Sequence, residues 1–111
     1  MKVDSISDGA LRIEGMELTH AGAGGIAAWV CIVAGPLRIA GCALKAQPDG
    51  TLRLYMPKAG SRRGRIMFLD RSLFHTAGEL AATAFYAMGG DASAAVAEAK
   101  ARAEAREAEA A

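Results

Sequence analysis

Apolar and polar side chains alternate near the start of the chain. In "ALRIEGMEL" (10–18), Leu11 and Ile13 share one face of an extended backbone, while Arg12 and Glu14 share the other. A period of two residues is typical of a strand with one buried face, because successive side chains point to opposite sides of a sheet. The sequence therefore predicts a first, half-buried strand.

Three more strands are predicted along the next forty residues. The apolar, β-branched run "IAAWVCIVAG" (26–35) predicts a buried strand in the centre of the sheet, and "LRIAGCALKA" (37–46) predicts the strand after it. "PDG" (48–50) has the composition of a turn and leads into "TLRLYM" (51–56). Alternation in that last strand predicts an inward face and an outward face, formed by Leu52, Leu54 and Met56 and by Arg53 and Tyr55.

A fifth strand and one helix are predicted after residue 64. "RIMFLD" (65–70) alternates as a short strand. Thr76 followed three residues later by Glu79 matches a capping box, and apolar residues then recur at helical spacing up to the Gly89-Gly90 pair. We expect one packed helix over 77–88.

The end of the chain differs in composition. From Ser93 onwards it consists of Ala, Glu, Lys and Arg with one larger aliphatic residue, Val96. Alanine favours helix, but the segment lacks an apolar stripe, so we expect a frayed, solvated helix or a semi-rigid tail. The predicted organisation is a domain over 1–90 and a tail over 91–111. Its fold class is α+β, a small antiparallel sheet of about five strands followed by one packed C-terminal helix, plus the Ala/Glu-rich helical tail.

Composition limits the class of protein. Of the 111 residues, 52% are hydrophobic, which excludes disorder for most of the chain. The longest apolar run (26–37) is interrupted by glycine and proline and is shorter than a membrane-spanning helix. The N-terminus has no export signal, so we expect a cytoplasmic protein without a membrane partner.

Candidate catalytic and metal-binding residues are few. Cys31 and Cys42 lack metal-ligand spacing, so both are expected to be buried free thiols. His20 and His75 have no partners that would complete a triad or a zinc site. "GAGGIA" (22–27) precedes a predicted strand rather than a helix, so it is expected to form a turn and not a dinucleotide site. We therefore expect no enzymatic activity, catalytic residue, metal, cofactor or small-molecule substrate.

Positive charge is concentrated in the middle of the chain. The net charge is only +1, yet residues 45–71 contain seven Lys or Arg against two Asp. The segment "MPKAGSRRGR" (56–65) is either a phosphate-binding surface or a solvated loop, and both interpretations stay open. Tyr55 either stacks on a base or packs as an ordinary strand residue, and with so few aromatic residues we do not expect a stacking platform of the RNA-recognition type. The candidate nucleic-acid-binding residues are Lys58, Arg62, Arg63, Arg65, Arg53, Lys45 and Arg71.

From about Leu11 to Gly90 the chain resembles the SpoVG family of bacterial septation and sporulation regulators. The resemblance rests on "LRIAGCALKA", on "GTLRLYMP" with its Met56-Pro57 end, on the basic loop after it, and on a short strand and a helix entered through "SLFHTAGEL". It implies a small antiparallel sheet with a C-terminal helix, a dimer, and binding of DNA or RNA. The chain departs from the family in a shorter loop after Met56-Pro57 and in a helix without Lys or Arg.

The leading functional expectation is a non-catalytic, homodimeric regulator that binds DNA or RNA through its basic loop. A dimer is also expected because a five-strand sheet with one short helix leaves a face or an edge uncovered. The alternative is a protein-interaction module that uses an exposed strand edge or the C-terminal helical tail.

Overall fold

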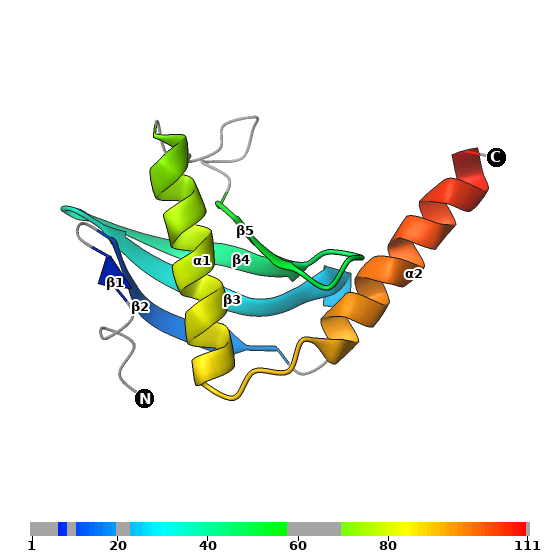
Figure 1. The fold of residues 1–111 in the computed structure, drawn as a ribbon, viewed down its shortest axis with the longest axis horizontal. Helices are drawn as coiled ribbons and strands as arrows, with labels where there is room; N and C mark the ends of the chain where they lie inside the picture. Colours follow the sequence, from blue (N-terminus) through cyan, green and yellow to red (C-terminus); the bar gives the residue numbers. More distant parts are fainter. Residues whose placement is uncertain (1–6, 9–10, 20–22, 58–69, 111) are drawn as a thin grey trace.

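The protein has an α+β fold with one antiparallel sheet and two helices (Figure 1). The computed structural model describes residues 7–8, 11–19, 23–57 and 70–110. Within these ranges the sheet has the order β1-β2-β3-β4-β5, in which each strand pairs with its neighbour in the sequence. The elements are β1 (Ser7–Asp8), β2 (Leu11–Leu18), the 3-10 turn η1 (Ala23–Gly25), β3 (Ile26–Ala34), β4 (Leu37–Ala46), β5 (Leu52–Tyr55), α1 (Arg71–Ala87) and α2 (Ser93–Ala110).

Four of the predicted strands are confirmed as β2 to β5. Tight turns fix their pairing. Gly35 adopts a positive φ of 56° between β3 and β4, a conformation that glycine tolerates better than any other residue. Between β4 and β5, Gly50 also has a positive φ of 92°, and its N–H donates to the Gln47 carbonyl over 2.9 Å. The predicted fifth strand (65–70) falls outside the described residues except for Asp70, which caps a helix and is not part of a strand.

One face of the sheet packs against α1. The helix contributes three alanines and Phe85 to this core, and none of the four is more than 1% exposed. Because alanine side chains are small, the helix approaches the strands closely. The sheet contributes large aliphatic residues, among them Leu11, Ile13, Val30, Ile32, Leu44 and Leu54.

The helix α1 begins at Arg71, six residues before the predicted start, so the predicted capping box at Thr76 is wrong. Asp70 is the N-cap, and its Oδ1 accepts hydrogen bonds from the N–H and the hydroxyl of Ser72. Thr76 lies inside the helix and donates its hydroxyl to the Ser72 carbonyl. The earlier start also brings Phe74 against the core, which favours the longer helix.

The predicted helix end at Gly89-Gly90 is confirmed. Gly89 has a φ of 82°, and its N–H donates to the Tyr86 carbonyl. The N–H of Gly90 donates to the Phe85 carbonyl over 2.9 Å. This pair of hydrogen bonds is a Schellman motif, which satisfies carbonyls that the helix leaves free.

The segment after Asp91 is helical, but it does not lie wholly apart from the core. Ala92, Ala95 and Ala99 are buried, and a Cβ on Gly25 would lie 3.9 Å from both the Ala95 carbonyl oxygen and the Ala99 Cβ. The expectation of a tail without a docking face is therefore wrong for the first two turns of α2, because alanine and glycine allow a close approach without large apolar side chains. The rest of α2 projects away from the body (Figure 1). No described helix combines the length and the apolar content needed to cross a membrane.

Candidate nucleic-acid interface

The face of the sheet opposite α1, here called the open face, has no described helix packed on it. Leu54 shows which side chains point to each face, because Leu54 itself faces α1. A Cβ on Gly78 of that helix would lie 3.9 Å from the Leu54 Cβ. Arg53 and Tyr55 flank Leu54 in β5 and therefore point to the opposite side. The buried residues of α1 and Ala95 of α2 belong to the core that contains Leu54. Figure 1 shows α1 crossing only one side of the sheet.

A row of four residues crosses the open face at right angles to the strands. Glu17 of β2 pairs with Trp29 of β3, Trp29 pairs with Ala43 of β4, and Ala43 pairs with Tyr55 of β5. Residues paired in register point to the same face of a sheet. We call these four residues the aromatic row; it presents Trp29 with 43% of its surface exposed.

Two cations lie next to the aromatic row, at its β5 end. Lys45 of β4 and Arg53 of β5 are direct cross-strand partners, and we call them the basic pair. The Lys45 ammonium lies 4.9 Å from the centre of the Tyr55 ring, which is a cation–π contact. Among the described residues neither member of the basic pair forms a salt bridge. Two cross-strand partners of like charge therefore have no carboxylate partner in the described part of the chain.

Two further arginines of the open face share one carboxylate. Arg12 and Arg38 occupy a second row, since each pairs with Val33 of β3. Glu14 bridges them, with one carboxylate oxygen 3.2 Å from Arg12 Nη2 and the other 2.6 Å from Arg38 Nη2. These two arginines thus already have a counter-charge, in contrast to the basic pair.

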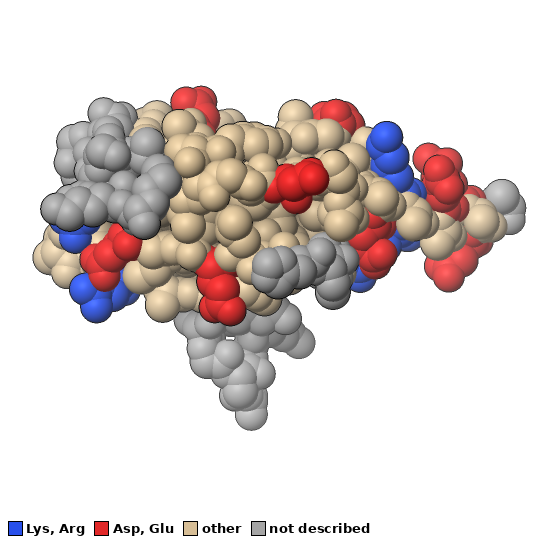
Figure 2. Space-filling model, turned by 90° about the horizontal axis from the view of Figure 1, so that it is seen from below, with Lys and Arg blue, Asp and Glu red and all other residues tan. Residues whose placement is uncertain are grey.

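Positive charge is not continuous on the neighbouring side of the molecule. Figure 2 shows this side, seen from below the view of Figure 1. The described basic side chains lie near its two ends, and acidic side chains are dispersed over it. This side therefore does not present a continuous phosphate-binding surface within the described residues.

The structure brings together only some of the predicted site residues. Lys45 and Arg53 lie side by side on the open face with Tyr55. Arg71 is exposed at the first turn of α1, in the helical layer. The four cations of the basic segment, Lys58, Arg62, Arg63 and Arg65, lie outside the described residues.

Trp29 was not predicted as a site residue. The run 26–35 was expected to be buried, but Trp29 is exposed. The reason is that α1 covers one face of β3 only. The sequence does not reveal this, because the positions that face α1 and the positions on the open face, Trp29, Cys31 and Val33, are all apolar.

Both cysteines are free thiols, as predicted, but the predicted burial is confirmed only for Cys42. Cys42 is fully buried, and this burial raises the pKa of its thiol to about 11, with the nearby Cys31 thiol adding to the rise. Cys31 is only half-buried. A thiol with so high a pKa is protonated at neutral pH and is a poor nucleophile.

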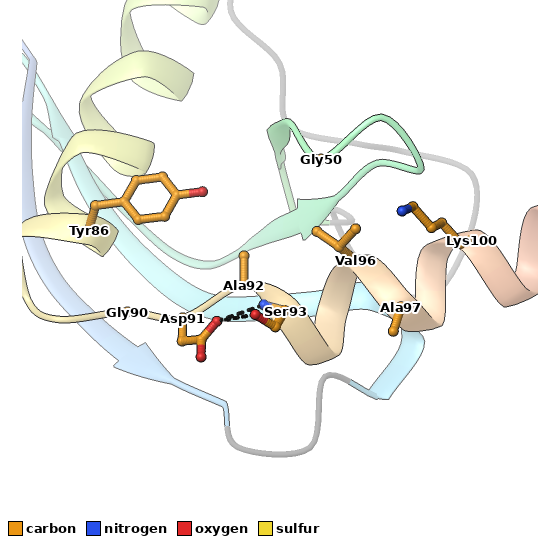
Figure 3. A pocket seen from close by; sticks show the side chains of 9 residues that line it. All are labelled: Gly50, Tyr86, Gly90, Asp91, Ala92, Ser93, Val96, Ala97 and Lys100. Carbon is orange, nitrogen blue, oxygen red and sulfur yellow. Dashed lines mark hydrogen bonds between the residues drawn. The ribbon is translucent and has the colours of Figure 1, made fainter.

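An open groove of about 540 Å³ lies between the end of α1, the β4–β5 turn and the start of α2 (Figure 3). Tyr86 and Lys100 face it from the two helices, and Gly50 faces it from the turn. The Asp91 carboxylate is occupied, because its Oδ1 accepts from the N–H and the hydroxyl of Ser93. The titratable side chains that line the groove are Tyr86, Lys100 and Asp91, and one oxygen of Asp91 already accepts from Ser93.

The described part of the chain contains no group of three or more His, Cys, Asp or Glu side chains that could hold a metal ion. His75 is exposed and lies within α1, whereas the predicted helix over 77–88 would have placed it before the helix. No protein-family model, curated protein or solved structure matches the chain.

Proposed function

We propose that this protein is a non-catalytic regulator that binds DNA or RNA through phosphate contacts on the open face. The observation that supports the proposal is the basic pair, Lys45 and Arg53, which are cross-strand partners without a salt bridge to any described carboxylate. Like charges placed directly opposite each other destabilise a sheet. A polyanion bound across them removes that repulsion and releases its own counterions.

The sequence adds further cations after β5. Lys58 follows Tyr55 by three residues, so the basic segment 58–65 continues the chain directly from β5. In the proposal its Lys58, Arg62, Arg63 and Arg65 add phosphate contacts to those of the basic pair, and Arg71 adds one from the start of α1. Such contacts position a protein on nucleic acid without reading its sequence.

The remaining details of the proposal concern the sheet and the assembly. In the proposal, the strand predicted from 65 onwards is an additional strand that follows the basic segment and ends before Asp70, the cap of α1. A homodimer of the type implied by the SpoVG resemblance would double the number of phosphate contacts. Sedimentation at micromolar concentration tests the dimer and would contradict it by showing a monomer alone.

The proposal is tested by removing the basic pair. The double variant Lys45→Ala/Arg53→Ala is expected to bind a nucleic acid more weakly and to reduce the slope of log affinity against log salt. The reduction is about 0.9 per lost phosphate contact on duplex DNA and about 0.7 on a single strand. Lys100→Ala/Arg106→Ala is the matched control, because both residues are exposed on α2 and the change in charge is equal. Equal binding by the two double variants would contradict the proposal.

One observation favours the alternative, a protein-interaction module. The second half of α2 projects away from the body and is exposed along most of its length (Figure 1). A partner protein that packs against it would bind with little dependence on salt, whereas phosphate binding weakens steeply as salt rises. A salt titration therefore separates the two functions.

A further inference from the structure

We infer that the aromatic row stacks on unpaired bases, so that the protein prefers single-stranded nucleic acid to a duplex. This inference rests on the proposed function and names its ligand class. It depends on Trp29, Tyr55 and the basic pair, which lie on the same face of the sheet.

Trp29 is the residue that most needs an explanation on this face. It lies in β3, a central strand, yet 43% of its surface is exposed. A large aromatic ring in the middle of a sheet face offers a flat apolar surface to a ligand. Base–aromatic stacking suits such a ring because every base has a π-face.

The spacing of the two aromatic residues also fits nucleotides that are not paired. Trp29 and Tyr55 lie in one row two strands apart, which is roughly 10 Å at the usual spacing between strands. Ala43, between them, has the smallest side chain of the row, Trp29 is exposed, and Tyr55 is half-buried. In a duplex the faces of the bases are covered by their neighbours, so only bases of a single strand can stack on these rings.

The cations are placed to hold the phosphates of such a strand. Lys45 is already in contact with the Tyr55 ring, at 4.9 Å, and Arg53 pairs with Lys45. A base stacked at Tyr55 would therefore have its phosphate next to two positive charges. Glu17 places a negative charge at the opposite, β2 end of the row. The nucleic acid strand is therefore expected to run along the β4–β5 side.

A second copy of the chain is the main competitor for the same face. Its Glu17 could approach the basic pair and its Trp29 could pack on Ala43. The polyanion is favoured because the basic pair has no carboxylate partner among the described residues, and because the segment that follows β5 in the sequence contains four more cations. Loss of Trp29 would lower the affinity for a single strand if a nucleic acid binds this face, and would break a dimer if a second copy binds it.

The experiment uses the intrinsic fluorescence of Trp29, the only tryptophan of the chain. An oligothymidylate of about 12 nucleotides and a duplex of equal length are titrated into the wild-type protein at several salt concentrations. The single strand is expected to quench the emission and to bind more tightly. Trp29→Ala is expected to lower the affinity for the single strand about 5- to 150-fold and to leave the affinity for the duplex nearly unchanged. Tyr86→Ala is the matched control, since Tyr86 is exposed on α1, away from the open face.

The possible outcomes separate this inference from the proposed function. Salt-dependent binding of both nucleic acids without quenching would overturn the stacking inference and leave phosphate binding intact. Absence of binding to either nucleic acid would overturn both. A wild-type dimer that becomes a monomer in Trp29→Ala would assign the open face to a second copy and overturn the inference as well. If Trp29→Ala fails to fold, quenching of Trp29 fluorescence in the wild-type protein still tests the inference.

Discussion

Gly90 lies against the ring of Phe85: a Cβ at position 90 would come within 2.6 Å of the Cε1 and Cζ atoms of that ring. The Gly90 N–H also donates to the Phe85 carbonyl over 2.9 Å. The same glycine therefore completes the end of α1 and leaves room for the largest fully buried side chain of the core.

Gly90→Ala is expected to destabilise the protein. The new methyl group forces the Phe85 ring out of its position in the core, and overpacking of this kind costs about 1–3 kcal/mol. Gly78→Ala is the control, because Gly78 lies in α1 with its nearest side-chain neighbour at 3.9 Å, and alanine favours helix there. Urea denaturation should show a lower midpoint for Gly90→Ala alone. Equal midpoints for the two variants would contradict the role of Gly90.

Stability should fall in acid because of Asp70 and Asp91. Hydrogen bonds from the Ser72 and Ser93 side chains and backbone N–H groups lower the pKa of these two carboxyls below the ordinary value of 3.8. Since the folded pKa lies below the unfolded one, the stabilisation is complete above the unfolded value and is lost as the pH falls through the folded value. The melting temperature should therefore drop below about pH 4.

Variants of the two serines supply the control for this acid effect. In Ser72→Ala/Ser93→Ala each carboxylate loses the hydroxyl donor but keeps the backbone N–H donor, so the pKa values should move towards the ordinary value. The fall in melting temperature between neutral pH and about pH 3 should then be smaller than in the wild type. An unchanged fall would show that other carboxyls cause the acid sensitivity.

The docking of α2 is tested by one substitution at two positions. Ala95 is 2% exposed in the core, whereas Ala101 is exposed on the same helix. Ala95→Glu places a charge where no partner is available and should lower the free energy of unfolding by more than 1 kcal/mol, on the order expected for a buried unpaired charge. Ala101→Glu should change it by at most about 0.5 kcal/mol. Equal effects at both positions would show that α2 does not dock.

The strands were predictable because their signals are local. Alternation marks β2 and β5, and the residues at 48–50 supply a turn that fixes which residues of β4 and β5 face each other. The start of α1 was not predictable from the sequence. Two cap candidates are acceptable there, Thr76 with Glu79 and Asp70 with Ser72. The choice depends on whether Phe74 packs on the core, which is a tertiary contact.

The candidate site was predictable in part for the same reason. Lys45 and Arg53 were both identified by their charge, and their pairing follows from the turn between β4 and β5. The exposure of Trp29 was not predictable, because it depends on which face of β3 is covered by α1. The docking of α2 was also missed, since Ala92, Ala95 and Ala99 have helical spacing but little contrast in hydrophobicity with their alanine-rich surroundings.

The basic segment itself is tested by the triple variant Arg62→Ala/Arg63→Ala/Arg65→Ala. If each arginine neutralises one phosphate, the slope of log affinity against log salt should fall by about 0.9 per arginine on duplex DNA, and by twice that in a dimer. Sequence preference should change little, because phosphate contacts do not read bases. Fluorescence anisotropy at several salt concentrations measures the slope, and circular dichroism checks that the variant is folded.

A second triple variant separates contact from net charge. Lys100→Ala/Arg102→Ala/Arg106→Ala removes three exposed cations from α2, so it lowers the net charge of the protein by the same amount. A long-range effect of net charge would weaken binding alike in both variants, whereas direct contact would reduce the slope only in the variant of the basic segment. If the slopes of both variants equal that of the wild type, the arginines of 62–65 only solvate the chain. The protein-interaction function would then be favoured over nucleic-acid binding.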